Sequence, residues 1–318
     1  MIDVALRVVS VFLIILLGFI AYKCGMITRK DSKLLSSIMM NIAAPCLTLA
    51  TVSSQRIDPE TWKMVKIGFL AVAVYYVSAA VLNFGLAKML RPKREDFGIY
   101  WVELTFSNSG FLCFPICLAV FGNEAFFYAV IMNLLCTLFM YTLAIAQVCY
   151  GSGEEGQGVD WKGQLKNLLS PPTIAAVVGV GMFVMDIQLP DFLLNSCDTV
   201  GNMLVPLSML VIGVQLGDSK LGNMLSNLRY MGYSALKLLL WPVITFAACM
   251  VCKVPTIITV VITLTQAMPA GSLPVVFAEQ YGRNSKLGAE LVFISTLLSM
   301  ITIPVACILL TQYLQGAM

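Results

Sequence analysis

The sequence predicts an all-α polytopic membrane protein with ten transmembrane helices, arranged as two inverted repeats of five. Three observations support this fold class. The 318 residues are 59% hydrophobic and only 12% charged, with a mean hydropathy of +0.87, whereas about 25% of the residues of an average soluble domain are charged. Ten apolar stretches alternate with polar connections. Two helix-breaking motifs occupy matching positions in the two halves of the chain.

Each of the ten stretches is uncharged or nearly so, and a spanning helix needs about 20 such residues. The stretches cover residues 5–22, 34–54, 67–87, 98–122, 125–150, 169–185, 192–217, 230–252, 254–278 and 291–314. The first and the sixth are short. No small-residue cleavage site follows the first stretch, so we expect it to remain as a span rather than to be removed as a signal peptide.

The distribution of Lys and Arg predicts the orientation, because these residues are enriched in cytoplasmic loops. With ten spans, fifteen of the 20 basic residues fall on one side and five on the other. The smaller group consists of Arg7, Arg56, Lys63, Lys66 and Lys253. We therefore expect a multi-pass protein of the plasma (cytoplasmic) membrane with both termini outside. The Gly-rich polar segment 151–169 is then a cytoplasmic linker between the halves.

The two halves of the chain, residues 1–150 and 170–318, each contain five expected spans. Because five is odd, the second half enters the membrane in the opposite orientation. Four matches recur at an offset of 159 to 161 residues: Asn41-x-x-x-Pro45 with Asn202-x-x-x-Pro206, Gly18 with Gly179, Pro115 with Pro274, and Gly122 with Gly282. Their nearly constant offset indicates an inverted repeat, an architecture found in many secondary carriers.

The helix-breaking motifs are Asn108-Ser-Gly-Phe-Leu-Cys-Phe-Pro115 in the fourth stretch and Gln266-Ala-Met-Pro-Ala-Gly-Ser-Leu-Pro274 in the ninth. Gly and Pro free backbone groups that lipid cannot satisfy, so each break must face protein or a wet cavity. We expect spans four and nine to be broken helices that cross near the bilayer midplane, with new helices beginning near Pro115 and Pro274. Two such helix N-termini would bind an anion without any Lys or Arg.

Nine residues at or near these motifs are candidates for contact with a carboxylate substrate. They are Asn108, Ser109, Pro115, Gln266, Pro269, Ser272, Pro274, Asn41 and Asn202. Asn41 and Asn202 have an alternative role, in which their side chains satisfy carbonyl groups freed by the nearby prolines.

Two charged residues lie inside expected spans. Glu103 is the only acid well inside a span and is a candidate proton-coupling group. Because it follows Asp96 closely, an alternative is that it reaches the cytoplasmic interface. For Lys237, in the eighth span, we expect the side chain to snorkel to the interface.

The residue types present argue against an enzyme. The chain has no His and ten Cys, most of them inside expected spans, where Cys acts as a small apolar residue. No phosphate loop, metal-ligand cluster or nucleophile–base set is recognisable. We therefore expect no metal site and no cofactor beyond a coupling H⁺ or Na⁺. The net charge of +3 gives no indication of a nucleic-acid partner.

At these residues the sequence resembles the auxin efflux carrier family, whose members include bacterial relatives of the plant PIN proteins. The resemblance covers essentially the whole chain. It is carried by Asn41-Ile-Ala-Ala-Pro45, by the motif from Asn108 to Pro115, by Gly201-Asn-Met-Leu-Val-Pro206, by the run from Ala267 to Gly282, and by Ser295-Thr-Leu-Leu-Ser299 with Pro304.

The resemblance implies an elevator-type carrier in which spans 1, 2, 6 and 7 form a scaffold and spans 3–5 and 8–10 form a moving transport domain. It also implies substrates such as malate, malonate or, in plants, indole-acetic acid. A homodimer through the scaffold helices is a further implication. The linker at 151–169 is much shorter than the cytoplasmic loop of many plant members, which leaves hormone-specific regulation unsupported.

Two alternative functions remain open from the sequence. A sodium-coupled carrier of the bile-acid symporter type shares this architecture, but sodium would need carboxylate or carbonyl ligands near the breaks, where Glu103 is the only acid. A membrane-embedded sensor would bind its ligand at the same breaks without transporting it. Transport that is unchanged when potassium replaces sodium would exclude the first, and isotope counterflow would exclude the second.

Overall fold

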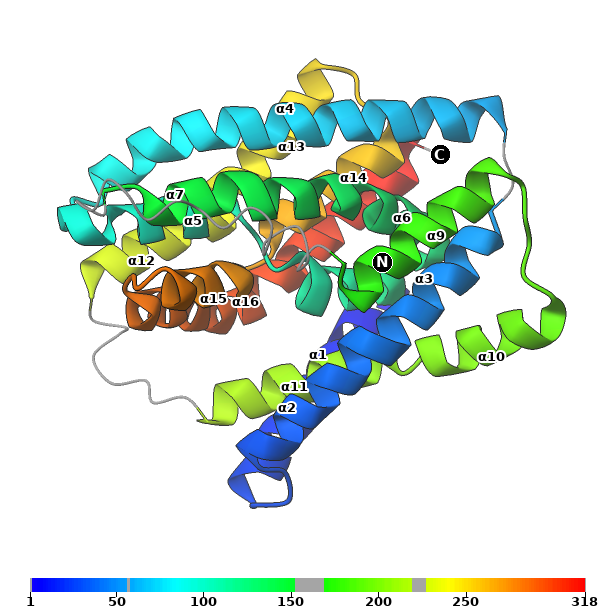
Figure 1. Cartoon of the computed structure of the whole chain (residues 1–318), viewed down its shortest axis with the longest axis horizontal. Helices are drawn as coiled ribbons and strands as arrows, with labels where there is room; N and C mark the ends of the chain where they lie inside the picture. Colours follow the sequence, from blue (N-terminus) through cyan, green and yellow to red (C-terminus); the bar gives the residue numbers. More distant parts are fainter. Residues whose placement is uncertain (1, 56–57, 152–168, 219–226, 318) are drawn as a thin grey trace.

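The computed structural model describes residues 2–55, 58–151, 169–218 and 227–317. Over these residues the regular structure is helical, and one isolated bridge joins Ser107 to Ala270. The predicted linker at 151–169 lies largely outside the described residues. The helices gather into a single bundle in which the two halves of the chain are interleaved (Figure 1).

Six helical runs among the described residues are long and apolar enough to cross a membrane. They are Arg29–Ser53, Pro59–Met89, Ser109–Cys149, Asp191–Asp218, Leu228–Val251 and Ser285–Gly316. Three shorter apolar helices, Val9–Lys23, Pro171–Val184 and Thr256–Ala267, fall in the first, sixth and ninth expected stretches. The prediction of an all-α polytopic membrane protein is therefore confirmed, and the count of ten spans stays a prediction.

The N-terminal half contains helices up to α7. They are α1 (Ile2–Lys23), α2 (Arg29–Ile38), η1 (Met39–Ala43), α3 (Ala44–Ser53), α4 (Pro59–Met89), η2 (Arg94–Asp96), α5 (Phe97–Thr105), η3 (Ser109–Cys113), α6 (Phe114–Phe139), η4 (Met140–Ala144) and α7 (Ile145–Cys149). Side-chain caps start three of them. Thr28 and Asp31 form a capping box on α2, Asp58 accepts a hydrogen bond from the backbone of Thr61 at α4, and Asn108 caps η3.

The C-terminal half begins with α9. Its helices are α9 (Pro171–Val184), α10 (Asp191–Gly201), α11 (Leu204–Asp218), α12 (Leu228–Ala235), η5 (Leu236–Leu240), α13 (Trp241–Val251), α14 (Thr256–Ala267), α15 (Leu273–Gln280) and α16 (Ser285–Ala317). Prolines mark several starts. Pro171 opens α9, Pro190 and Pro255 are the N-cap residues of α10 and α14, and Pro242 and Pro274 lie in the first turns of α13 and α15. At these positions the missing N–H of proline needs no partner.

Small residues allow close contacts between α1 and α11 and between α3 and α9. A Cβ atom on Gly213 of α11 would lie 2.1 Å from the backbone oxygen of Ile15, and one on Gly18 of α1 would lie 2.4 Å from that of Leu210. On α9, a Cβ atom on Gly179 would lie 3.3 Å from the Cβ of Val52. Glycine is therefore needed where α1 meets α11, as in other membrane helix pairs whose backbones approach closely.

Gly122 and Gly282 both have a positive φ angle. Gly122 interrupts α6 with φ 81°, so the second part of the fourth expected stretch and the fifth stretch form one run, Ser109–Cys149, with a non-helical residue between them. Gly282 follows α15 with φ 61°. Only glycine adopts positive φ readily, which explains glycine at both positions of this sequence match.

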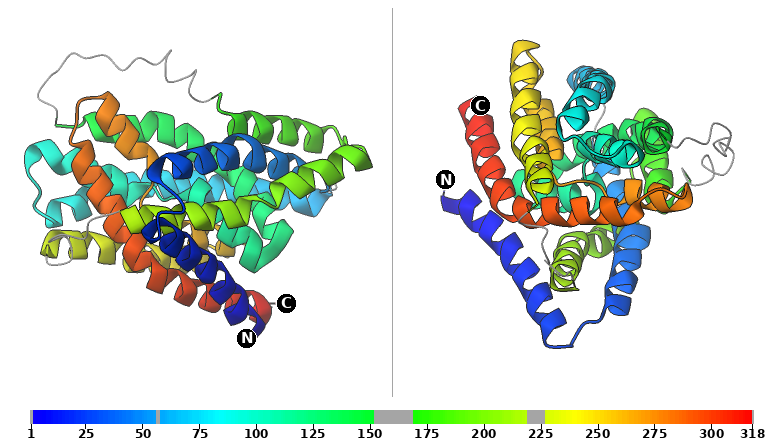
Figure 2. Two further views of the ribbon diagram at one scale, coloured as in Figure 1. Left: turned by 90° about the horizontal axis from the view of Figure 1, so that it is seen from below. Right: turned by 90° about the vertical axis from the view of Figure 1, so that its left-hand side faces the viewer.

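Loops predicted to be cytoplasmic meet at one end of the molecule. The Arg283 side chain donates to the backbone oxygen of Glu95 at 2.7 Å, and Asn284 donates to the Asp96 carboxylate at 2.8 Å. Both chain termini lie in the opposite half of the long axis (Figures 1 and 2). This arrangement agrees with the grouping of loops by charge, while the assignment of that end to the cytoplasm stays a prediction.

Candidate functional site

The helices of the fourth and ninth expected stretches are both interrupted. α5 ends at Thr105, and helical structure resumes with η3 at Ser109. α14 ends at Ala267 and α15 begins at Leu273. The prediction that these helices are broken at the motifs Asn108–Pro115 and Gln266–Pro274 therefore agrees with the structure, although the first break begins two residues before its motif.

The two interruptions cross each other in the protein interior and run antiparallel. The backbone N–H of Asn108 donates to the oxygen of Pro269 at 2.8 Å, and that of Gly271 donates to the oxygen of Phe106 at 3.2 Å. Together with the bridge between Ser107 and Ala270, these bonds pair the backbone groups that the breaks set free. Lipid could not satisfy such groups.

The first break restarts its helix earlier than predicted. Asn108 is the N-cap residue, and its Oδ1 accepts a hydrogen bond from the backbone of Phe111 at 3.1 Å. The helix thus begins with the π-helical turn η3 at Ser109, not near Pro115, which lies inside the first turn of α6. The wider π turn accommodates the proline ring and its missing N–H. At the second break the prediction is accurate, because Pro274 is the second residue of α15.

A small cavity of about 20 Å³ lies beside the crossing, between α4, α6 and α14. Its polar lining includes Ser109, Asn133, Thr265 and Gln266. This volume corresponds to about one water molecule, which is too little for an organic acid. The helices around the cavity must therefore separate before a larger solute can occupy this place.

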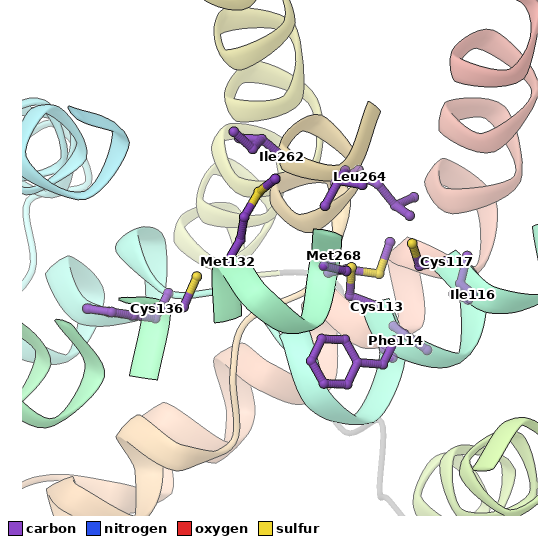
Figure 3. Close-up of a cluster of buried hydrophobic side chains, with 14 of the residues drawn as sticks. Cys113, Phe114, Ile116, Cys117, Met132, Cys136, Ile262, Leu264 and Met268 are labelled. Carbon is purple, nitrogen blue, oxygen red and sulfur yellow. The ribbon is translucent and has the colours of Figure 1, made fainter. Parts of the chain in front are cut away.

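The apolar wall of the cavity consists of aromatic, aliphatic and sulfur-containing side chains. Figure 3 shows Met132, Cys136 and Ile262, which line the cavity, and Cys113 and Met268, which lie close by without lining it. All five are buried, and the Cys113 Sγ lies 3.5 Å from the Thr265 Oγ1. Thiols and thioethers in such a place pack as soft apolar groups, so the cavity has an apolar wall beside its polar lining.

Side chains from other helices satisfy carbonyl groups at the end of α5. Lys237 of η5 donates from Nζ to the oxygen of Leu104 at 3.1 Å, and Tyr233 of α12 donates to the oxygen of Glu103 at 3.3 Å. The last carbonyls of any helix lack partners within the helix. Lys237 is fully buried, so the prediction that it snorkels to the interface is wrong. Its ammonium is instead held at the negative end of the α5 dipole.

Glu103 is fully buried as well. Among the described residues, neither of its carboxylate oxygens has a hydrogen-bond partner. The alternative that it reaches the cytoplasmic interface is therefore wrong. A buried carboxyl group without partners is unusual, because desolvation of its charge is unfavourable.

A family model described as membrane transport protein matches residues 3–307. The chain belongs to this family. The resemblance to auxin efflux carriers is thereby confirmed over nearly the whole sequence. The chain is also 23% identical to an uncharacterized transporter of Methanocaldococcus jannaschii over an alignment of 310 residues, which covers 93% of this chain and 95% of the relative. An uncharacterized transporter of Methanothermobacter thermautotrophicus is 24% identical over 309 residues, 95% of this chain and 97% of the relative.

In this membrane transport protein a neutral polar network supports the end of α5. The Trp241 indole donates to the Asn83 side chain at 2.7 Å, and Asn83 and Gln147 each donate to the Thr105 hydroxyl at 3.2 Å. These residues come from α13, α4 and α7. We had no prediction for this network, although polar residues such as Asn83 and Gln147 inside apolar stretches were a signal that could have indicated it.

The transporter does not gather all nine predicted site residues. Asn108, Ser109, Gln266 and Pro269 lie at the crossing, where Gln266 accepts a hydrogen bond from Ser107 at 3.2 Å. Pro115 lies in the first turn of α6, after the π-helical turn η3, and Pro274 lies in the first turn of α15. Ser272, the N-cap residue of α15, is exposed.

Asn41 and Asn202 lie elsewhere in the transporter. Both are exposed, and each amide donates one turn back along the chain, Asn41 to the Ser37 hydroxyl at 3.0 Å and Asn202 to the Asp198 carboxylate at 3.1 Å. The hydrogen bonds found for them are therefore to side chains, not to carbonyl groups freed by proline. Neither residue lines the cavity beside the crossing.

Proposed function

We propose that this protein is a secondary transporter of small organic anions, with carboxylates such as malate, malonate or auxin-like acids as substrates. The main observation in support of this function is the antiparallel pairing of two unwound segments in the protein interior, joined by the hydrogen bond from Asn108 to Pro269. Such breaks expose helix ends where a solute can bind, and they are the usual binding-site feature of secondary transporters.

Recognition of an anion would use the helices that begin at the crossing. The helical run starting at Ser109 and helix α15 both have their N-terminal ends there, and free amides at such ends favour negative charge. Ser109, Thr265 and Gln266 add hydrogen-bonding groups beside them. The apolar wall opposite would contact the carbon skeleton of the acid.

Alternating access would follow from two inverted repeats of five spans. Three observations support this architecture. The α1–α11 pair and the α9–α3 pair would be equivalent contacts in the two repeats, Gly122 and Gly282 share positive φ, and each expected stretch contains helix. We propose that α1–α3 and α9–α11 form the scaffold of a homodimer in the plasma membrane, with both termini outside. The remaining helices would move as an elevator carrying the crossing.

Counterflow in proteoliposomes tests this function, with radiolabelled malonate as the first probe and malate and indole-acetic acid as further probes. We expect Asn108→Ala and Pro115→Ala to abolish exchange although both variants insert normally. Asn195→Ala, an exposed amide on α10, is the matched control and should exchange like the wild type. Normal exchange by both Asn108→Ala and Pro115→Ala would overturn the site. Binding of a probe without counterflow would instead identify a sensor.

A further inference from the structure

We infer that Glu103 and Lys237 form a proton-binding pair beside the crossing, and that proton uptake by this pair offsets the charge of the carried anion. Proton binding by the pair is a property of the protein alone. Compensation of the anion's charge rests on the proposed transport of anions. The pair is distinct from the cavity, since neither side chain lines it.

The geometry of the pair differs from that of a structural salt bridge. Both side chains are fully buried at the C-terminal end of α5, yet they form no direct ion pair in the described part of the chain. The Lys237 ammonium bonds to the Leu104 carbonyl, while the carboxylate oxygens of Glu103 have no hydrogen-bond donor there. A buried ion pair is stable only when hydrogen bonds satisfy both partners. A buried carboxylate without hydrogen-bond donors, such as that of Glu103, is suited to accept a proton.

Lys237 occupies a place where a coupling cation would be expected. In broken-helix carriers, sodium ions or protons bind near unwound carbonyls and the C-terminal ends of half-helices. Here the C-terminal end of α5 already holds an ammonium group, attached to η5 by its own side chain. A sodium ion at this position would be repelled, so the exchangeable cation is a proton on Glu103.

The other groups around Glu103 are already engaged or uncharged. Tyr233 of α12 and Tyr75 of α4 donate their hydroxyls to the backbone oxygens of Glu103 and Thr105. Gln147 of α7 is neutral, and α16 presents Gly288, where a Cβ atom would lie 3.4 Å from Glu103 Oε1. The next acid on α16, Glu290, accepts a hydrogen bond from Tyr230 at 2.5 Å. Lys237 is thus the charged group that faces Glu103 from these elements.

Charge counting gives the consequence for transport. With Glu103 ionised and Lys237 protonated, the pair has no net charge. A proton from the aqueous phase that bonds to one carboxylate oxygen gives the pair a charge of +1. This charge lies near the end of α5, five residues before Asn108, so it favours an anion at the crossing. By linkage, a bound anion favours the proton equally.

Infrared difference spectroscopy of the purified full-length protein tests proton binding without any substrate. We expect a C=O band of a protonated carboxyl group whose intensity rises when the buffer changes from mildly basic to mildly acidic. The band should have the properties of a carboxyl group shielded from solvent, and it should be lost in Glu103→Gln. Glu124→Gln, an exposed acid on α6, is the matched control and should retain it. Lys237→Met should lose the pH-dependent change. Glu103→Asp is the variant to use if Glu103→Gln misfolds. It keeps a carboxyl group and should show a shifted band. A band unchanged in Glu103→Gln would overturn the inference.

Malonate uptake into proteoliposomes tests the second statement. An inward proton gradient should stimulate uptake about fivefold or more, and Glu103→Gln should abolish this stimulation while malonate counterflow persists. Replacement of sodium by potassium should change nothing. Sodium dependence, or full stimulation in Glu103→Gln, would overturn the coupling. If the wild-type protein transports none of the probes, the proposed function fails, and the infrared band still decides whether the pair binds a proton.

Discussion

The two helix breaks at the crossing have similar backbones and different surroundings. Both are buried extended segments that bond to each other. At the first, the end of α5 is held by the charged side chain of Lys237. At the second, the backbone N–H of Ala270 donates to the neutral hydroxyl of Ser295 on α16 at 3.2 Å. The first break is therefore supported by a charged side chain and the second by a neutral one.

The helices that follow the breaks also start differently. Asn108 caps the helix after the first break with its own side chain, whereas Ser272, the N-cap residue of α15, makes no side-chain cap hydrogen bond. An uncapped helix N-terminus has amides free for a ligand. The first break thus provides most of the internal bonding, and the second leaves more of its helix end available.

Among the substitutions at the two breaks, loss of the buried ammonium of Lys237 should lower the free energy of unfolding most. Lys237→Met leaves the Leu104 carbonyl without its donor and Glu103 without its opposite charge. Removal of one partner of a buried pair costs about 3–5 kcal/mol. We expect a loss of that size in the free energy of unfolding, measured by equilibrium denaturation in mixed micelles.

The double variant Glu103→Gln/Lys237→Met is the matched control. It removes both charges, so it should recover much of the stability that Lys237→Met loses. If the double variant were as unstable as the sum of its single substitutions, the two side chains would be energetically independent, and the first break would not be a charged site.

The neutral hydrogen bond from Ala270 to Ser295 at the second break should contribute less to the free energy of unfolding. Ser295→Ala leaves the buried N–H of Ala270 without an acceptor, which costs about 1–3 kcal/mol. The matched control is Ser299→Ala, one turn further along α16, where the buried hydroxyl donates only to the Thr296 carbonyl of its own helix. Equal losses in both variants would show that the bond to Ala270 is not what holds this break.

The sequence was sufficient to locate the breaks because their causes are local. Pro269, Gly271 and Pro274 fall within six residues, and lipid excludes an unpaired backbone wherever it occurs. The restart of the first helix was placed wrongly because a proline was given more weight than an asparagine. Asn108 caps the turn before Pro115 is reached, and both signals were visible in the sequence.

The partners of the buried groups could not be predicted from sequence. Lys237 lies 133 residues from its acceptor, Leu104, and periodicity carries no information about such a distant contact. The same holds for the bonds among Asn83, Thr105 and Trp241. Asn41 and Asn202 were chosen because they repeat, yet they are exposed. A repeat shows that two positions are equivalent, and it does not show that they bind the same solute.

Substitution of the two N-cap residues, Asn108 and Ser272, should have the smallest effect on the free energy of unfolding. Asn108→Ala removes the side-chain acceptor for the Phe111 amide, and loss of such a cap costs about 1 kcal/mol. Ser272→Ala removes no cap hydrogen bond, so its free energy of unfolding should match the wild type. The same mixed-micelle denaturation measures both. Equal losses in the two variants would mean that the breaks are capped alike and that α15 has no more free amides than the first helix. A difference near 1 kcal/mol would instead identify the start of α15 as the end with amides available to the anion.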